Sequence, residues 1–280
     1  ARAIVKSFQP QVVIGVGGYA SGPTLKEATM LGVPALIQEQ NSFPGKTNKL
    51  LSKNVASICV AYEGLERFFP KEKIVLTGNP VRRDMVDIAG KKEQAFEHYG
   101  LDPAKRTLLI IGGSLGAKTL NESTMMAYDK LAQSDVQILW QCGKLYDTDL
   151  SERLKEKEVP NIKRTMFIDR MDLAYAVADV IVSRAGAISV SELCLVGKPV
   201  ILVPSPNVAE DHQTKNAMAL VDKGAAILVK DVEAREKLFS VALDLQMNKE
   251  KCNGLSQSII KLGKPEATEH IVNEIERIAR

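Results

Sequence analysis

Several kinds of residue are scarce in this chain of 280 residues, and each scarcity argues against a class of protein. Aromatic residues make up 5% of the chain, which leaves little to stack the bases of single-stranded nucleic acid, so no nucleic-acid partner is expected. No apolar run reaches the length of a membrane span, and residues 1–10 contain no signal-peptide core. The cysteines lie far apart without a CxxC pair, which is typical of a reduced, intracellular protein without a disulfide framework or zinc site; they are Cys59, Cys142, Cys194 and Cys252.

The length and composition indicate a folded protein of two domains. A chain of this length exceeds the usual size of one domain, and 45% hydrophobic residues can supply two cores. Charged residues make up 25% of the chain, and 37 basic against 34 acidic side chains leave a net charge of +3. Such a balance argues against a disordered chain.

Short β-branched and aliphatic runs alternate along the chain with glycine-containing or polar turns and helical stretches. This alternation is typical of an α/β protein, with helices covering both faces of parallel sheets. The expected strands are apolar throughout, as strands covered on two sides must be. They are predicted at residues 12–15, 33–38, 56–61, 74–77, 108–111, 137–141, 179–183 and 200–204.

A change of pattern near residues 80–92 predicts a domain boundary at about Asp84. Residues 1–84 carry 11 basic and 6 acidic side chains, a net charge of +5, whereas the remainder carries 26 and 28, a net charge of −2. The basic first part suits an anionic partner or membrane surface, although ordinary surface variation explains it equally well. A second domain is expected over 85–264, and a last helix over 265–280 with a stripe of isoleucines at Ile271, Ile275 and Ile278.

Two segments of the first part could contact a ligand. Residues 15–23 place four glycines between a strand and a helix, where backbone amides can approach an anion. Ala20 stands where a dinucleotide fingerprint needs its third glycine, so a plain tight turn is the simpler interpretation. Four polar residues at 38–41 follow the next strand, at an edge that lines ligand crevices in parallel sheets. They could bind sugar hydroxyls or place a carboxylate, or form an ordinary polar loop.

Three segments of the second part show the same strand–turn–helix arrangement. Gly112, Gly113 and Ser114 open a helix as a phosphate cradle would, but without the Gly-Lys-Ser/Thr ending that ATP hydrolysis needs. Residues 183–192 repeat the pattern, and Glu192 could accept both hydroxyls of a ribose or simply complement the helix dipole. In the third segment, His212 and Gln213 could face the crevice or be solvated.

In their order and spacing, these segments closely resemble the MurG family of N-acetylglucosaminyltransferases over nearly the whole chain. The motifs that carry the resemblance are Gly17-Gly18-Tyr19, Ser21-Gly22-Pro23, Glu39-Gln40-Asn41, Thr47-Asn48, residues 78–82, residues 112–117, residues 183–192 and residues 212–217. The resemblance implies the GT-B fold, two Rossmann-like parallel-sheet domains, with the first one truncated. It implies transfer of GlcNAc with inversion from UDP-GlcNAc to the C4 hydroxyl of undecaprenyl-pyrophosphoryl-MurNAc-pentapeptide (lipid I to lipid II), in peptidoglycan synthesis at the cytoplasmic face of the bacterial plasma membrane.

The resemblance also implies roles for individual residues. Ser114 and the amide of Ile188 would hold the diphosphate, the backbone of Ile168 the uracil, and Glu192 the ribose. The positions that match those contacting GlcNAc are Ala187, His212 and Gln213. The positions on the acceptor side are Tyr19, Glu39 and Asn41, with Arg82 in the segment between the domains.

The sequence departs from the family pattern at three places. The family more often has Gln-Gln at His212-Gln213, and many members have histidine at Gln38. The family's GGTGGH loop, which holds its best candidate for the general base, has no match here. The resemblance therefore predicts a first domain without its start and little or no turnover by this chain. Glu39 is then the candidate catalytic base within the chain.

The resemblance implies no required cofactor, because helix N-termini would stabilise the charge that grows on the departing diphosphate. The one Asp-x-Asp pair, Asp147 and Asp149, is better explained by a helix start, and Mg²⁺ could stimulate without a dedicated protein site. Two alternatives stay open at this point. One is an isomerase like UDP-GlcNAc 2-epimerase, of the same architecture, and the other is a non-catalytic subunit that binds the donor.

Overall fold

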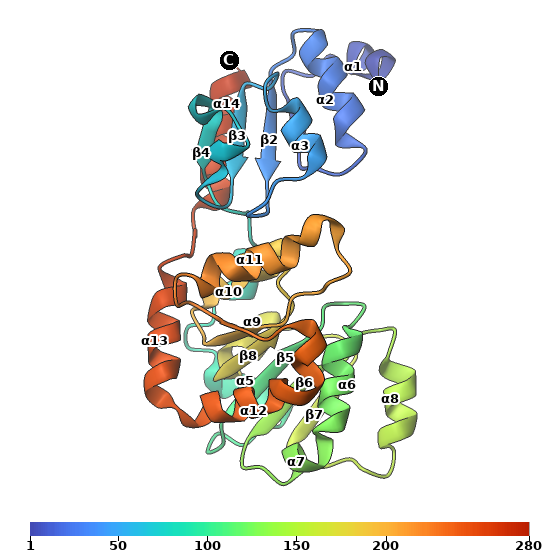
Figure 1. The fold of residues 1–280 in the computed structure, drawn as a ribbon, viewed down its shortest axis with the longest axis vertical. Helices are drawn as coiled ribbons and strands as arrows, with labels where there is room; N and C mark the ends of the chain where they lie inside the picture. Colours follow the sequence, from blue (N-terminus) through green and yellow to red (C-terminus); the bar gives the residue numbers. More distant parts are fainter. Residues whose placement is uncertain (280) are drawn as a thin grey trace. The chain divides into compact units, whose positions relative to one another are not determined.

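The computed structural model describes residues 1–279, whose contacts divide the chain into two compact units (Figure 1). Unit 1 comprises Ala1–Val81, Ala209–Asn216 and the chain from Lys264 onward, and unit 2 comprises Arg82–Val208 and Ala217–Gly263. The sequence placed the first boundary at about Asp84, within a few residues of this division. It placed residues 209–216 in the second domain, whereas their contacts group them with unit 1. Each unit is described by itself.

Unit 1 is built on a four-stranded parallel sheet with the order β1-β2-β3-β4. Every residue of β2 and β3 is buried, as expected for strands covered on two sides, and the buried residues include the polar Gln38, Glu39 and Ser57. The strands are β1 (Val13–Gly15), β2 (Ala35–Glu39), β3 (Ser57–Val60) and β4 (Ile74–Leu76). In this register Glu39 pairs with Val60 at the carboxyl end of the sheet, where the following loops carry the polar residues.

Helices cover this sheet and close a small apolar core, which includes Ile37, Ile58 and Phe69. The helical elements of unit 1 are α1 (Arg2–Phe8), α2 (Ser21–Met30), α3 (Lys46–Leu51), the 3-10 turns η1 (Leu65–Arg67), η2 (Lys71–Lys73) and η3 (Ala209–Asp211), and α14 (Ala267–Ala279). Helix α2 packs very close to β1, since a Cβ on Gly15 would lie 2.5 Å from Leu25 Cδ2. Gly15 therefore sets the distance at which the helix can approach the strand.

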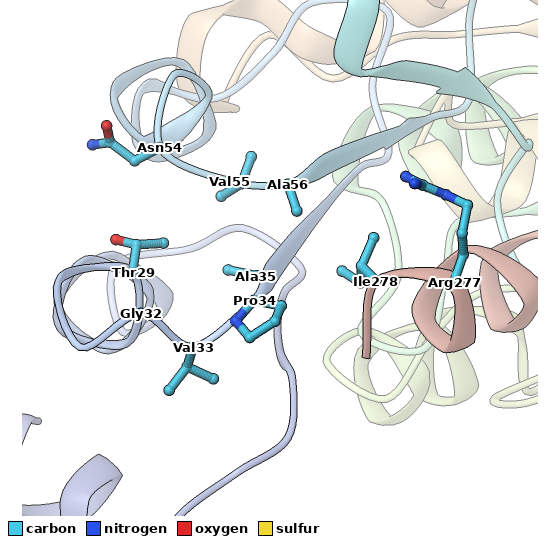
Figure 2. Close-up of a pocket in the computed structure, with 10 residues that line it drawn as sticks. All are labelled: Thr29, Gly32, Val33, Pro34, Ala35, Asn54, Val55, Ala56, Arg277 and Ile278. Atoms are coloured by element: carbon cyan, nitrogen blue, oxygen red, sulfur yellow. The ribbon is translucent and has the colours of Figure 1, made fainter. Parts of the chain in front are cut away.

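Helix α14 packs against β3 with a carboxylate on its buried side. Glu274 is buried and accepts two hydrogen bonds from the guanidinium of Arg277, at 2.9 and 2.6 Å, which lower the pKa of Glu274. Arg277 and Ile278 also line a cavity of about 460 Å³ with residues that precede or begin β2 and β3 (Figure 2). The cavity lies at the amino ends of these strands, away from Glu39 at the carboxyl end of β2.

Unit 2 contains a six-stranded parallel sheet with the order β10-β9-β8-β5-β6-β7. The chain builds outward from β5 to β6 and β7, and then returns to add β8 on the other side of β5. The order therefore reverses between β5 and β8, and α/β sheets bind ligands at the carboxyl ends of the strands at such a reversal. The strands are β5 (Thr107–Ile111), β6 (Gln137–Gln141), β7 (Ile162–Thr165), β8 (Val180–Ser183), β9 (Val200–Leu202) and β10 (Ile227–Leu228).

Helices flank the sheet of unit 2, and a hydrophobic core lies under α6 and α12. The remaining helical elements are α4 (Arg83–Val86), α5 (Lys92–Tyr99), α6 (Lys118–Met126), α7 (Tyr128–Ala132), α8 (Asp147–Leu154), α9 (Met171–Val177), α10 (Ala187–Val196), α11 (His212–Val221), η4 (Asp231–Glu233), α12 (Ala234–Met247) and α13 (Lys249–Ile260). Trp140 is fully buried in this core and donates from its indole to Asn121 Oδ1 at 3.0 Å. Within residues 1–279, no helix combines the length and apolar character needed to cross a bilayer.

Candidate functional site

The loop that follows β5 is held against the loop that follows β6 by backbone hydrogen bonds. The amide of Lys144 donates to the carbonyl of Ser114 at 3.1 Å, and the amide of Leu145 donates to the carbonyl of Leu115 at 3.3 Å. These bonds leave the side chain of Ser114 exposed at the carboxyl end of β5. The helix α6 begins just beyond, so its unpaired first-turn amides and the Ser114 hydroxyl can face one anion.

The two loops approach each other at a pair of glycines. Any other residue at either position would displace neighbouring atoms. A Cβ on Gly143 would lie 2.5 Å from the carbonyl carbon of Leu115 and closer still to the amide nitrogen of Gly116. A Cβ on Gly116 would lie 2.7 Å from the ring of Tyr146 and closer still to a backbone oxygen. Both glycines have positive φ, +85° and +87°, which adds a second reason for glycine.

A second helix N-terminus lies at the carboxyl end of β8. Helix α10 starts at Ala187 after Gly186, so the amide of Ile188 lies in the first turn, where backbone amides have no acceptor within the helix. The neighbouring Arg184 is committed elsewhere, because it pairs with Asp231 and donates to the carbonyl of Val203. The backbone at the start of α10 is therefore the part of this loop that can bind an anion.

Glu192 lies farther along α10 and is partly buried. Its Oε2 accepts a hydrogen bond of 3.0 Å from the hydroxyl of Tyr175 in α9. Burial raises the pKa of Glu192, and the bond from Tyr175 opposes that rise. Sequence analysis selected Glu192 but not Tyr175, whose apolar helical surroundings gave no signal.

Ile168 lies in the loop between β7 and α9, and its side chain is buried. Thr165 Oγ1 donates to the carbonyl of Phe167 at 2.7 Å, and the hydroxyl of Tyr99 donates to the carbonyl of Arg170 at 2.9 Å. These bonds restrain the backbone on both sides of Ile168. Asp172, at the start of α9, accepts from Lys91 at 3.0 Å and from Arg170, and these bonds lower its pKa.

In unit 1, Glu39 organises the loop that follows β2. Its Oε1 accepts from the amide and side-chain nitrogens of Asn41 at 3.0 and 3.3 Å. Its Oε2 accepts from the amide of Gly45 at 3.1 Å and from Asn48 Nδ2 at 2.7 Å. Only 3% of Glu39 is exposed, and four bonds occupy the acceptor positions of its carboxylate. Its role as the general base stays a prediction; in the structure the carboxylate holds the loop.

The same loop is joined to residues 209–216. Asn216 is fully buried, accepts from the amide of Ser42 at 3.0 Å and donates to Asn41 Oδ1 at 3.1 Å. His212 is partly buried, with its ring centroid 6.5 Å from that of Phe43, and Gln213 is partly buried beside it. The sequence had placed His212 and Gln213 with the donor-binding residues of the second domain, whereas their contacts group them with unit 1. The reason is that the hydrogen bonds of Asn216 join this segment to the loop that follows β2.

The two remaining predicted residues are exposed. Tyr19 is 99% exposed in a turn where Gly17 and Gly18 have positive φ. Arg82 is exposed and forms an ion pair of 2.5 Å with Asp84. Neither the exposure of Tyr19 nor the ion pair of Arg82 explains a specific role, so the roles assigned to these two residues stay predictions. Among residues 1–279, Ser114, Ile168, Ala187, Ile188 and Glu192 belong to unit 2, and Tyr19, Glu39, Asn41, His212 and Gln213 belong to unit 1.

Comparison with known proteins identifies the family. The glycosyltransferase family 28 C-terminal domain matches residues 107–271, and the N-terminal domain of that family matches residues 1–60. The UDP-N-acetylglucosamine–N-acetylmuramyl-(pentapeptide) pyrophosphoryl-undecaprenol N-acetylglucosamine transferase of Bacteroides fragilis is 54% identical over 282 residues, covering 100% of this chain and 74% of its own. The crystal structure of Acinetobacter baumannii MurG is 31% identical with a TM-score of 0.78, covering 99% of this chain and 76% of its own. The chain belongs to the MurG family.

Membership of the MurG family confirms the resemblance, the GT-B fold and the glycosyltransferase class. The enzyme of Cytophaga hutchinsonii with the same name is 55% identical over 275 residues, covering 98% of this chain and 73% of its own. A UDP-GlcNAc 2-epimerase from Neisseria meningitidis has a TM-score of 0.71, covers 99% of this chain and 79% of its own, and is 14% identical, so it shares the fold alone. The epimerase and the non-catalytic subunit are therefore not favoured.

Proposed function

We propose that this MurG-family chain transfers GlcNAc from UDP-GlcNAc to the C4 hydroxyl of undecaprenyl-pyrophosphoryl-MurNAc-pentapeptide, with inversion. The observation that carries the proposal is the 54% identity, across the whole chain, to an enzyme named for this transfer. The geometry of unit 2 supports it, since two helix N-termini and a carboxylate lie at the carboxyl edge of one parallel sheet. The reaction belongs to peptidoglycan synthesis.

In this proposal, the two helix N-termini of unit 2 hold the diphosphate of the donor. Ser114 and the first-turn amides of α6 contact one side, and the amide of Ile188 contacts the other. Negative charge grows on the diphosphate as its bond to C1 of GlcNAc breaks, and fixed dipoles stabilise that charge without reorganising. The backbone at Ile168 holds the uracil, and Glu192 accepts the ribose hydroxyls.

The acceptor binds to unit 1 in this proposal. Glu39 keeps Asn41 and the loop to Asn48 in place, and Tyr19 is exposed at the neighbouring strand–helix turn. By their match to the family, Ala187, His212 and Gln213 contact the GlcNAc of the donor. Arg82 belongs to the segment between the domains. The acceptor's C4 hydroxyl attacks C1 of GlcNAc on the face opposite to UDP, which leaves, and the configuration at C1 is inverted. The hydroxyl proton passes to a general base, a role for which Glu39 stays the predicted candidate within the chain.

Substitution of the donor contacts tests this assignment. Ser114→Ala and Glu192→Ala should each weaken UDP binding, measured by titration calorimetry, by about 1–3 kcal/mol, because each removes a hydrogen-bond partner of a charged or buried group. Glu266→Ala, an exposed carboxylate of unit 1, serves as the control and should leave the affinity unchanged. Unchanged affinity in both site variants would show that the nucleotide does not bind at this edge of the sheet.

Incubation of the chain with UDP-GlcNAc alone should leave the UDP-GlcNAc intact, whereas a 2-epimerase would convert it.

Removal of divalent metal is expected to leave donor binding in place. We propose that the helix N-termini, and no resident metal, balance the charge of the diphosphate, with Mg²⁺ acting at most from solution. The affinity for UDP should therefore be the same after dialysis against EDTA as in Mg²⁺. A loss of binding in EDTA that Mg²⁺ restores would contradict this proposal.

We also propose that the chain acts as a peripheral protein at the cytoplasmic face of the plasma membrane, where its lipid-linked acceptor lies. The net charge of +5 over residues 1–84 supports this location, because basic side chains are attracted to the surface of an anionic bilayer.

A further inference from the structure

Tyr175 and Glu192 form a buried pair beneath the proposed donor site. Tyr175 is 2% exposed, so its ring packs entirely within unit 2. Its hydroxyl nevertheless finds a partner, the Oε2 of Glu192, at 3.0 Å. A buried tyrosine hydroxyl needs such a partner, but a carboxylate is a costly choice unless its charge is used.

The pair has one fixed direction of hydrogen bonding. Burial and the nearby carboxylate raise the pKa of Tyr175 well above its ordinary value, so the phenol keeps its proton and donates it. The same bond opposes the rise that burial causes in the pKa of Glu192, which favours the ionised carboxylate. Oε2 is thereby committed to Tyr175, and Oε1 is the oxygen left to accept from a ligand.

We propose that Tyr175 is the positioning residue for ribose recognition, holding Glu192 so that Oε1 accepts from the ribose hydroxyls of the donor and selects ribonucleotides over 2′-deoxyribonucleotides. The inference rests on the proposed function, in which Glu192 binds the ribose. It adds a residue that contacts no substrate and acts through the carboxylate. Without the phenol, the carboxylate of Glu192 loses the bond that fixes its rotation about the last side-chain torsion.

Tyr175→Phe removes one oxygen and keeps the ring in the core. We expect the affinity for UDP to fall about 10-fold, the usual effect of losing a hydrogen bond to a charged group. The affinity for 2′-deoxy-UDP should change much less, because that ligand lacks a hydroxyl that the oriented carboxylate recognises. The wild-type preference for UDP over 2′-deoxy-UDP should therefore shrink, as measured by titration calorimetry with both ligands.

Tyr128→Phe is the matched control. Tyr128 is 5% exposed in the same unit, and its hydroxyl donates to the carbonyl of Lys157 at 2.9 Å rather than to Glu192. Tyr128→Phe therefore also removes the hydrogen bond of a buried tyrosine hydroxyl, but we expect it to leave the preference for UDP over 2′-deoxy-UDP unchanged. Glu192→Gln, which keeps Tyr175, should lower the preference as Tyr175→Phe does. The double variant should lose no more than the larger single effect, because both changes act on one contact.

The outcomes separate this inference from the function on which it rests. If wild-type protein fails to bind UDP, the proposed function fails. Suppose that wild-type protein binds UDP and that Glu192→Gln lowers its affinity. If Tyr175→Phe then weakens the binding of UDP and 2′-deoxy-UDP equally, or weakens the binding of neither, the positioning role is overturned while the donor site stands. Should Tyr175→Phe not fold, an unchanged preference in Glu192→Gln would itself overturn the inference.

Discussion

Gly143→Ala should remove tight UDP binding and destabilise unit 2. The new Cβ would meet backbone atoms of Leu115 and Gly116, which cannot move without opening the loop that carries Ser114. The positive φ of Gly143 adds strain of its own. We expect a loss of roughly 3 kcal/mol or more in the free energy of unfolding. An opened loop should weaken UDP binding about 100-fold, measured by calorimetry alongside thermal unfolding.

Gly100→Ala is a control that separates the steric clash expected of Gly143→Ala from the backbone strain of a positive φ. Gly100 also has positive φ, +58°, but a Cβ there would meet nothing within 4 Å. It should cost only about 1–2 kcal/mol for the left-handed backbone and leave UDP binding unchanged. If Gly143→Ala costs no more than this control and binds UDP normally, the crossing of the two loops is not what shapes the site.

Glu39→Ala should release the loop between β2 and α3. The substitution leaves the partly buried amides of Asn41 and Gly45 and the buried side chain of Asn48 without their acceptor. Each unsatisfied buried group costs about 1–3 kcal/mol, so we expect unit 1 to lose several kcal/mol of stability. Hydrogen exchange at the amides of Asn41 and Gly45 should accelerate by about two orders of magnitude or more, because a stability loss of that size shifts local opening.

Glu66→Ala provides the control for this prediction. Glu66 is an exposed carboxylate of η1 in the same unit, and its removal should change the stability by less than about 0.5 kcal/mol. UDP binding, which we assign to unit 2, should survive Glu39→Ala. Unchanged exchange at Asn41 and Gly45 would contradict the organising role and leave the carboxylate available for the general-base role predicted from the sequence.

Sequence analysis predicted the strands that have an apolar centre and missed those that do not. Residues 137–141 were predicted as a strand and form β6 with the same bounds, because an apolar run of Ile, Leu and Trp is typical of a strand covered on both faces. Strand β7 (Ile162–Thr165) carries Lys163 and Arg164 and lies at the edge of the sheet, so its composition gave no such signal. Strand β10 has two residues, too few for a pattern, and lies at the other edge.

The amino-acid order alone was enough to identify the MurG family, the GT-B fold and the glycine loops, because these depend on residue types at short spacing along the chain. Tertiary structure alone decided which groups meet across long separations. The phenol of Tyr175 contacts Glu192 from another helix, and Gly143, in the loop after β6, packs against Gly116, in the loop after β5. Asn216 bonds to Asn41 from 175 positions away. Such pairs depend on how the strands are ordered in the sheet and on how closely two backbones approach. The local sequence pattern contains neither the strand order nor the distance between backbones.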